Sequence, residues 1–328
     1  MSRFYFPFLL LFVLFFVSKG WTQCCSPGNP IGGTSAVGVN DLHAWQFFLT
    51  YRYGYSGAYF EETKAVPADF IEQGNYNHVG MLAAYGLAER ITIEAETGVF
   101  LNKTQSYVSG ILPAQQIGRG LTDLSVTARI NVWKNQAREI EITGGAGFKA
   151  PLGPYEQRYQ GAILSRDLQP TTGSFDGIVS LFVYKGFLPQ KIRFFLLGRA
   201  ELKGQNPDRY RYGNFLALSG FATYSAGIRW VVAIQVRTEL RARDSRPLSG
   251  QGIPIANERE LIRPTGSEKV FVVPQISYAL TQKLNVSLLM DWPVYQRYND
   301  KQLATTLSAS LSLRYVLGGG SVPSVFGK

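Results

Sequence analysis

The 16 residues from Ile228 to Arg243 alternate between apolar and polar side chains, and this alternation most constrains the fold. Apolar residues take even positions and mostly charged or amide residues take odd ones: Ile228, Trp230, Val232, Ile234, Val236, Leu240 and Ala242 against Arg229, Gln235, Arg237, Glu239, Arg241 and Arg243. A period of two predicts a β-strand with one apolar and one charged face. The stretch exceeds the ~5 to 6 residues usual in soluble sheets. Because the pattern recurs along the chain, the apolar faces can meet lipid while the polar faces line a wet interior.

We therefore expect an all-β chain that forms a transmembrane antiparallel β-barrel over residues 44–316. About twelve segments have strand character, and bacterial single-chain barrels have an even number of strands. The expected strands are 44–55, 77–86, 91–102, 120–133, 140–150, 175–186, 192–203, 214–224, 228–243, 269–280, 284–295 and 303–316. Pro274 and Pro293 each remove a ladder hydrogen bond and predict a bulge or a strand end.

Short and long connections alternate along these segments. The short ones are 87–90, 134–139, 187–191, 225–227 and 281–283, and the long ones include 56–76, 103–119, 151–174 and 244–268. Connections 204–213 and 296–302 are shorter but fall on the long side. Outer-membrane barrels have short periplasmic turns and long extracellular loops, so this order predicts periplasmic termini.

The first 20 residues have the pattern of a secretory signal peptide. Arg3 precedes a run of about 14 uncharged residues, Phe4 to Val17, and Ser18 and Gly20 supply small residues for cleavage. A retained membrane anchor is the alternative. No other segment approaches 18 unbroken apolar residues, as a spanning helix would require. Residues 21–43 then predict a flexible periplasmic lead-in, and residues 317–328 a C-terminal tail.

The chain is basic, with a net charge of +10 that becomes 10 − 2 = +8 when Arg3 and Lys19 are removed with residues 1–20. A basic balance suits nucleic acid, anionic headgroups or anionic solutes, and the export signal argues against nucleic acid. The expected partners are outer-membrane lipids, a small-molecule solute and the barrel-assembly machinery during insertion. The only cysteines, Cys24 and Cys25, are either ordinary thiols in a tail or a lipidation site.

Alternation also separates a lipid face from a lumen face. The expected lipid-facing sets include Ile91, Ile93, Ala95, Val99 and Leu101; Leu124, Val126, Ala128, Ile130 and Val132; Phe194, Leu196, Ala200 and Leu202; and Leu303, Leu307, Leu311, Leu313 and Tyr315. The candidate lumen-lining residues are Glu94, Glu96, Arg129, Lys149, Arg193, Arg199, Glu201, Arg229, Arg237, Glu239, Arg241, Asp291 and Arg314.

One wall of the expected lumen is strongly basic. It carries seven cations and two acids: Arg193, Arg199, Lys203, Arg229, Arg237, Arg241 and Arg243 against Glu201 and Glu239. Such a wall attracts anions. In the alternative, Glu94, Glu96 and Glu141 neutralise it across a narrow lumen and form an ion-paired plug.

The residues give little support to catalysis or to a metal or cofactor site. His43 and His78 are expected at opposite ends of the barrel, at the starts of the first and second strands, without a nearby cysteine. We therefore expect no enzyme, no metal and no cofactor. A barrel-embedded lipid hydrolase using His78 is a minor alternative, because no spacing specifies a triad.

Three sequence blocks resemble a known family. Gly118-Arg119-Gly120-Leu121-Thr122-Asp123-Leu124 is followed by Gly145-Ala146-Gly147-Phe148-Lys149-Ala150-Pro151-Leu152-Gly153, and Asp167-Leu168-Gln169-Pro170 with Gly173 and Asp176-Gly177 form a third block. Together they resemble the outer-membrane barrel family of the meta-pathway of phenol degradation. The resemblance implies a channel or transporter, with hydrophobic or aromatic compounds among its solutes.

Two functions follow from these observations. The first is an outer-membrane channel for small solutes that pass passively through a charged lumen; Phe48, Phe100 and Phe195 are the inward aromatic residues expected to serve apolar solutes. The second is a non-conducting barrel that presents its loops for structure or surface interaction. Entry of residues 27–40 into the pore would argue against simple diffusion.

Overall fold

A computed structural model describes residues 38–318, except 69, 111–112, 188–190 and 251–252. The predicted signal peptide, both cysteines, most of the lead-in and nearly all of the C-terminal tail lie outside these residues. Among the described residues no helix is both long enough and apolar enough to cross a membrane.

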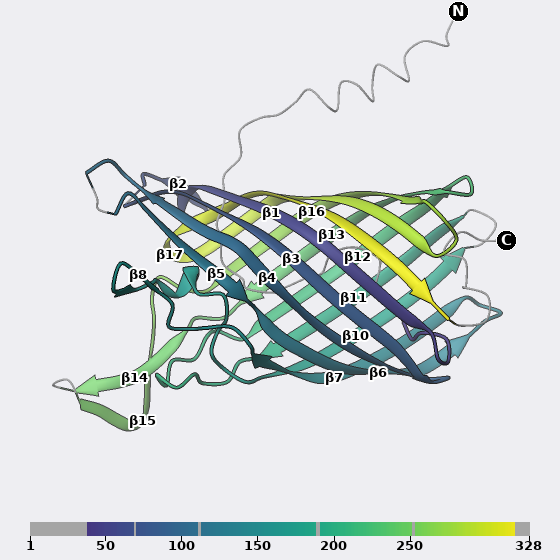
Figure 1. The fold of residues 1–328 in the computed structure, drawn as a ribbon, viewed down its shortest axis with the longest axis horizontal. Helices are drawn as coiled ribbons and strands as arrows, with labels where there is room; N and C mark the ends of the chain where they lie inside the picture. Colours follow the sequence, from purple (N-terminus) through teal and green to yellow (C-terminus); the bar gives the residue numbers. More distant parts are fainter. Residues whose placement is uncertain (1–37, 69, 111–112, 188–190, 251–252, 319–328) are drawn as a thin grey trace, which may run out of the picture.

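The described chain is a closed antiparallel barrel with almost no helix (Figure 1). Its 13-stranded sheet runs from β17 through β16, β13, β12, β11, β10, β7, β6, β4 and β3 to β1, and pairing of β17 with β1 closes the wall. The strands of this sheet are β1 (Trp45–Glu62), β2 (Lys64–Val66), β3 (Ile71–Ala88), β4 (Ile91–Tyr107), β5 (Gln115–Leu121), β6 (Asp123–Asn135), β7 (Ile140–Pro151), β10 (Asp176–Phe187), β11 (Ile192–Leu202), β12 (Phe215–Ala226), β13 (Trp230–Arg241), β16 (Ser267–Ala279) and β17 (Leu284–Leu317).

The last strand, β17, crosses the wall twice. It has 34 residues, pairs with β16 through residues 285–298 and pairs with β1 through residues 298–317. Its two halves meet again at the other end, where the Val316 N–H donates to Lys283 O at 3.0 Å. With the short strands β2 and β5 left aside, the eleven remaining labelled strands therefore cross the wall twelve times in the described chain. The prediction of an antiparallel barrel of about twelve strands is confirmed.

The two rims of the barrel differ. The short-turn rim contains the first residue of β1 and the last residue of β17, because Trp45 pairs with Leu317. The opposite, long-loop rim carries β2, β5, two small hairpins and a short 3-10 helix (Figure 1). The hairpins are β8 (Arg158–Tyr159) with β9 (Ala162–Ile163) and β14 (Ser245–Gly250) with β15 (Ile253–Leu261), and the helix is η1 (Arg166–Leu168). The predicted alternation of short turns and long loops is confirmed.

Exposure alternates along the strands as the sequence pattern predicts. On β6, Ile130 and Val132 are 51% and 65% exposed on the outside, whereas Arg129 and Asn131 between them are 8% and 4% exposed. Leu303 is an exception. It was expected on the lipid face but is only 1% exposed, because the pairing of β1 with β17 slips twice between Tyr55 and Tyr59 and changes the orientation of that end.

Of two further local predictions, the one at Pro293 is confirmed and the one at His78 is wrong. A register shift lies between Val270 and Phe271, the partner of Pro293, so the bulge expected at Pro293 is confirmed. His78 does not start a strand: β3 begins at Ile71, because the strand continues past the apolar band with polar residues that the pattern did not identify as strand.

Candidate functional site

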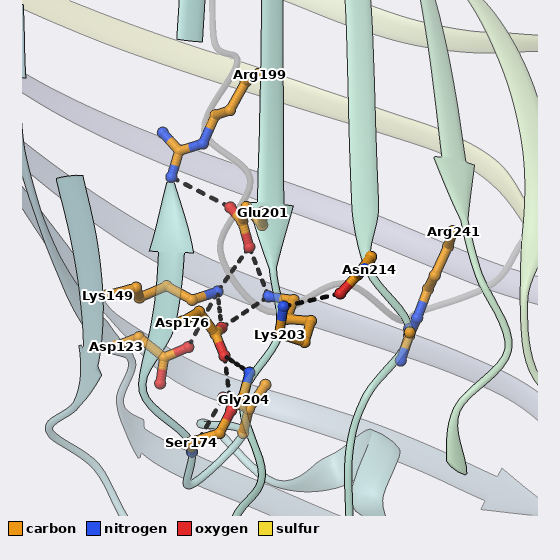
Figure 2. Close-up of polar contacts among 12 residues, drawn as sticks. Asp123, Lys149, Ser174, Asp176, Arg199, Glu201, Lys203, Gly204, Asn214 and Arg241 are labelled. Carbon is orange, nitrogen blue, oxygen red and sulfur yellow. Dashed lines mark hydrogen bonds and ion pairs between the residues drawn. The ribbon is translucent and has the colours of Figure 1, made fainter. Parts of the chain in front are cut away.

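The charged groups of the lumen pair with one another across strands. The largest group, which we call the four-strand cluster, consists of Asp123, Lys149, Asp176, Arg199, Glu201 and Lys203, from β6, β7, β10 and the end of β11. Lys149 Nζ lies 2.8 Å from Glu201, 3.3 Å from Asp176 and 3.5 Å from Asp123. Lys203 Nζ lies 2.5 Å from Glu201 and 3.0 Å from Asp176. Figure 2 shows how both lysines point at these acids. The cluster contains three acids and three bases, so it is balanced in charge.

Four cations of the predicted basic wall form ion pairs, namely Arg199, Lys203, Arg237 and Arg241. Arg199 contacts Glu201 at 3.2 Å and Glu96, on β4, at 3.5 Å. Arg129 on β6 pairs with Glu94 on β4. Of the three acids in the alternative of an ion-paired plug, Glu96 thus contacts the predicted wall, at Arg199, and Glu94 pairs with Arg129 outside that wall. Glu141 accepts hydrogen bonds from Val39 and Thr143 instead.

A second charged group lies on β1, β13 and β17, which stand across the closed barrel from the strands of the four-strand cluster. Asp291 on β17 accepts contacts from Arg52 on β1 at 2.5 Å and from Arg237 on β13 at 2.9 Å. Arg237 also lies 2.9 Å from Glu239, and its guanidinium stacks over Phe271 at 4.7 Å. Arg237 is only 2% exposed, so this part of the lumen is packed with side chains.

A loop from the long-loop rim folds into the barrel above the four-strand cluster. This inner loop, residues 164–174, buries Leu168, Gln169 and Thr171 to 2%, 1% and 1% exposure. Lys103 on β4 donates to Gln169 O at 2.9 Å, and Ser174 donates to Asp176 at 2.8 Å. The inner loop therefore narrows the lumen and is joined to the cluster by hydrogen bonds.

The first described residues narrow the lumen at the short-turn rim. Asn40 donates from its backbone N–H to Thr92 Oγ1 at 2.7 Å and from its amide to Ala84 O at 3.0 Å. Arg129 donates to Gly38 O at 3.3 Å. Contacts with Thr92 and Arg129 place residues 38–40 inside the barrel. Residues 27–37, the rest of the segment whose entry would argue against simple diffusion, lie outside the described residues.

The other predicted lumen residues are spread along the barrel. Arg241 contacts Asp244 at 3.2 Å near the long-loop rim, and Arg193 lies opposite Gly186 and Thr223 near the short-turn rim. Arg314 is partly buried on β17, and its Nε has no hydrogen-bond partner among the described residues. Arg229 is exposed in the turn before β13, where it donates to the Tyr278 hydroxyl at 3.2 Å, so it does not line the lumen. The strand predicted from alternation, residues 228–243, therefore begins two residues before β13 does.

Aromatic side chains form an apolar part of the lumen. Phe48 and Phe100 are 7% and 4% exposed. Phe195 lies between Phe182 and Phe221, with ring centroids 6.1 and 6.4 Å away. The sequence pattern missed Phe182 and Phe221 because their strands alternate less regularly. We call Phe182, Phe195 and Phe221 the aromatic stripe.

Among the described residues, no three or more His, Cys, Asp or Glu side chains are placed so that they could hold a metal ion together. His43 bonds the Tyr85 hydroxyl at 2.9 Å just before β1, whereas His78 faces the lumen on β3 beside the Phe100 ring, 4.8 Å between centroids. The two imidazoles therefore belong to separate surroundings.

No family model and no curated protein matches this chain. Among solved structures, the COG4313 outer membrane channel from Pseudomonas putida F1 aligns with 88% of this chain and 100% of its own, at 15% identity and a TM-score of 0.63. KdgM porin aligns with 83% and 99% at 7% identity and a TM-score of 0.42, and a Pseudomonas aeruginosa FadL homologue with 91% and 99% at 10% identity and 0.41. The first likeness shows the fold: this chain has the fold of a bacterial outer-membrane β-barrel. The predicted fold class is confirmed, and the fold agrees with the predicted outer-membrane location.

Proposed function

We propose that this protein is a passive outer-membrane channel for small solutes. The observation that supports it is the closed wall whose ionised groups lie inside and whose apolar side chains lie outside. A wall with this polarity separates lipid from a polar interior that spans the membrane. The COG4313 protein that shares the fold is named an outer membrane channel, which agrees with the proposal.

The lumen chemistry favours small solutes of low charge. The four-strand cluster holds as many acids as bases, and Glu94 and Glu96 pair with Arg129 and Arg199. Because paired charges produce a weak net field, the pore discriminates little between anions and cations. The inner loop and residues 38–40 narrow both ends, so the solute must be small.

The aromatic stripe supports hydrophobic or aromatic compounds as one solute class. Phe195 meets Phe221 edge-to-face and Phe182 in a stacked arrangement, so ring faces and edges both line this region. Flat apolar molecules make favourable contacts of both kinds. The resemblance to the barrel family of phenol degradation agrees with this class.

Liposome permeability tests the channel. Purified protein reconstituted into liposomes should admit small neutral solutes and exclude larger ones, and planar bilayers should show discrete conductance steps. Phe195→Ala should lower the uptake of an aromatic solute such as benzyl alcohol more than that of glycerol. Liposomes no more permeable than protein-free ones would contradict the proposal.

The dense packing of the second charged group favours a second candidate, a non-conducting barrel. Gln235 and Arg237 are 1% and 2% exposed, so little space remains beside them. A variant that widens the lumen separates the candidates: Lys149→Ser with Glu201→Ser and Lys203→Ser. If only this variant conducts, the natural protein is a closed barrel with a structural or surface role.

A further inference from the structure

The lipid-facing wall carries a hollow on β1, β3 and β4, which lie side by side in Figure 1. Its volume is about 590 Å³. The hollow exists because two small side chains, Ala83 and Ala95, are paired across β3 and β4. Larger outward side chains surround them, including Phe47, Leu49 and Met81. The wall is therefore indented where only hydrocarbon can contact it.

A polar array follows the hollow along the same strands, toward the long-loop rim. The Tyr51 hydroxyl donates to Asn77 Oδ1 at 2.5 Å, and Asn77 Nδ2 donates to Asn102 Oδ1 at 2.6 Å. Asn102 Nδ2 in turn donates to Asn75 Oδ1 at 3.0 Å. Tyr51 is 43% exposed and alternates with the lumen-facing Arg52, so the array lies on the outside of the barrel.

A β-bulge puts one member of the array on this face. The pairing of β3 with β4 shifts between Asn77 and His78: His78 pairs with Phe100, but Asn77 pairs with Asn102. Leu101 is the extra residue. Without the shift, Asn102 would follow the inward orientation of Phe100. Bulges that re-aim a side chain are frequent at functional positions.

The array rises to the depth of lipid headgroups. Strands that rise about 3.3 Å per residue with a tilt of roughly 40° climb about 2.5 Å per residue along the barrel axis. Tyr51 and Tyr55 lie six and ten residues beyond Trp45, the first residue of β1. Tyr51 is thus roughly 15 Å above the short-turn rim and Tyr55 roughly 25 Å. Because Asn77 pairs with Tyr53 and Asn75 with Tyr55, the array rises from inside an apolar band about 25 Å tall to its upper edge. The hollow, at Phe47 and Leu49, lies below them within the hydrocarbon.

The array has hydrogen-bonding capacity to spare and carries no charge. Each asparagine amide has two donors and an acceptor oxygen with two lone pairs. Asn102 donates to both Asn75 Oδ1 and Thr104 Oγ1, the latter at 2.8 Å, whereas the bonds of Asn77 use one of its donors and one lone pair of its oxygen. Phosphate is bound preferentially by arginine and lysine. Uncharged amides and phenols instead suit hydroxyl groups that both donate and accept.

We propose that the hollow and the polar array together bind one lipid molecule, whose acyl chain fills the hollow and whose sugar headgroup bonds to Tyr51, Asn77 and Asn102. The ligand is a glycosylated lipid of the surrounding membrane. This site lies on the outer wall and is independent of solute passage through the lumen.

Native mass spectrometry of the purified full-length protein tests the site. The probes are monogalactosyl dioleoylglycerol and dioleoyl phosphatidylglycerol, which share acyl chains and differ in headgroup. The natural protein should retain the galactolipid about tenfold better, a difference of about 1.4 kcal/mol. Asn77→Leu with Asn102→Leu should remove this preference and leave phosphatidylglycerol retention unchanged.

The hollow is tested separately from the array. Ala83→Phe with Ala95→Phe should lower retention of both lipids, whereas Ala200→Phe, on the outer face of β11, should lower neither. Folding of each variant is checked by its heat-dependent shift in gel mobility. Equal retention of the two lipids by the natural protein would overturn the proposal, and this measurement does not depend on any variant. Persistence of the preference in the asparagine variant would overturn it as well.

Discussion

Lys149 Nζ on β7 lies 2.8 Å from Glu201 Oε2 on β11, with β10 between the two strands. Both side chains are almost fully buried, at 3% and 4% exposure. Lys149→Met leaves Asp123 without its cation, whereas Lys203 still contacts Glu201 and Asp176. An uncompensated buried charge costs about 3 to 5 kcal/mol. We expect a loss of that size in the free energy of unfolding, measured by urea titration in lipid vesicles. Lys134→Met, at an exposed position on β6, should change it by less than about 0.5 kcal/mol. Equal effects of the two substitutions would contradict the structural role of the cluster.

Glu94 and Glu96 hold the lumen close to neutral by pairing with Arg129 and Arg199. Replacing both acids with glutamine removes two negative charges from the lumen and leaves the two guanidinium groups. The reversal potential in a salt gradient should therefore shift toward anion selectivity. Glu89→Gln, in the exposed turn between β3 and β4, should leave it unchanged. An unshifted potential in the double variant would mean that ions do not pass these residues.

The sequence predicted the crossings and most faces because period-two alternation is a local property. Arg129 and Asn131 could be assigned to the lumen from their own strand. Their partners could not, because partners depend on register across long loops. Lys149 and Glu201 are 52 residues apart, and Arg52 and Asp291 are 239 residues apart. The neutral lumen was therefore only one of two alternatives.

The remaining errors lie outside the apolar band, where side chains need not alternate between lipid and lumen. Gln73 and Asn75 extend β3 beyond its expected start at residue 77, and Leu303 turns inward next to two register shifts. The inner loop has no periodicity, so its insertion into the barrel could not be predicted from alternation. Its Gly118 contact is visible only in the structure.

Gly118 on β5 lies against the inner loop so closely that a Cβ atom would stand 1.9 Å from Leu168 O. Gly118→Ala must therefore displace the loop backbone, at a cost of about 1 to 3 kcal/mol. We expect lower stability and a changed single-channel conductance. Gly220→Ala is the matched control, because no atom lies within 4 Å of a Cβ at that position. A conductance change in the control alone would contradict the assignment of the inner loop as a constriction.

Tyr210 and Asp244 join two loops at the long-loop rim. The Tyr210 hydroxyl donates to Asp244 Oδ2 at 2.6 Å, and the Gly213 N–H and Arg241 also donate to this carboxylate. Burial, together with the Asp244 charge, raises the pKa of the Tyr210 phenol above its usual value of 10.0. The neutral phenol therefore stabilises the folded loops fully below pH 10.0, and this contribution is lost as the pH rises toward the folded-state pKa.

We therefore expect the loops to loosen above pH 10.0, which trypsin cleavage at Arg209 or Arg211 after a brief alkaline pulse would report. Tyr210→Phe cannot ionise, so its cleavage should not increase further with pH. It also lacks the hydrogen bond to Asp244, and losing this bond should lower the stability of the folded loops by about 1 to 3 kcal/mol. Its cleavage at neutral pH should therefore increase. Tyr159→Phe, on the small β8 hairpin, should behave as the natural protein does. If the natural protein and Tyr210→Phe showed the same alkaline increase, another group would have to control the loops, because only one of these proteins has a phenol at this contact.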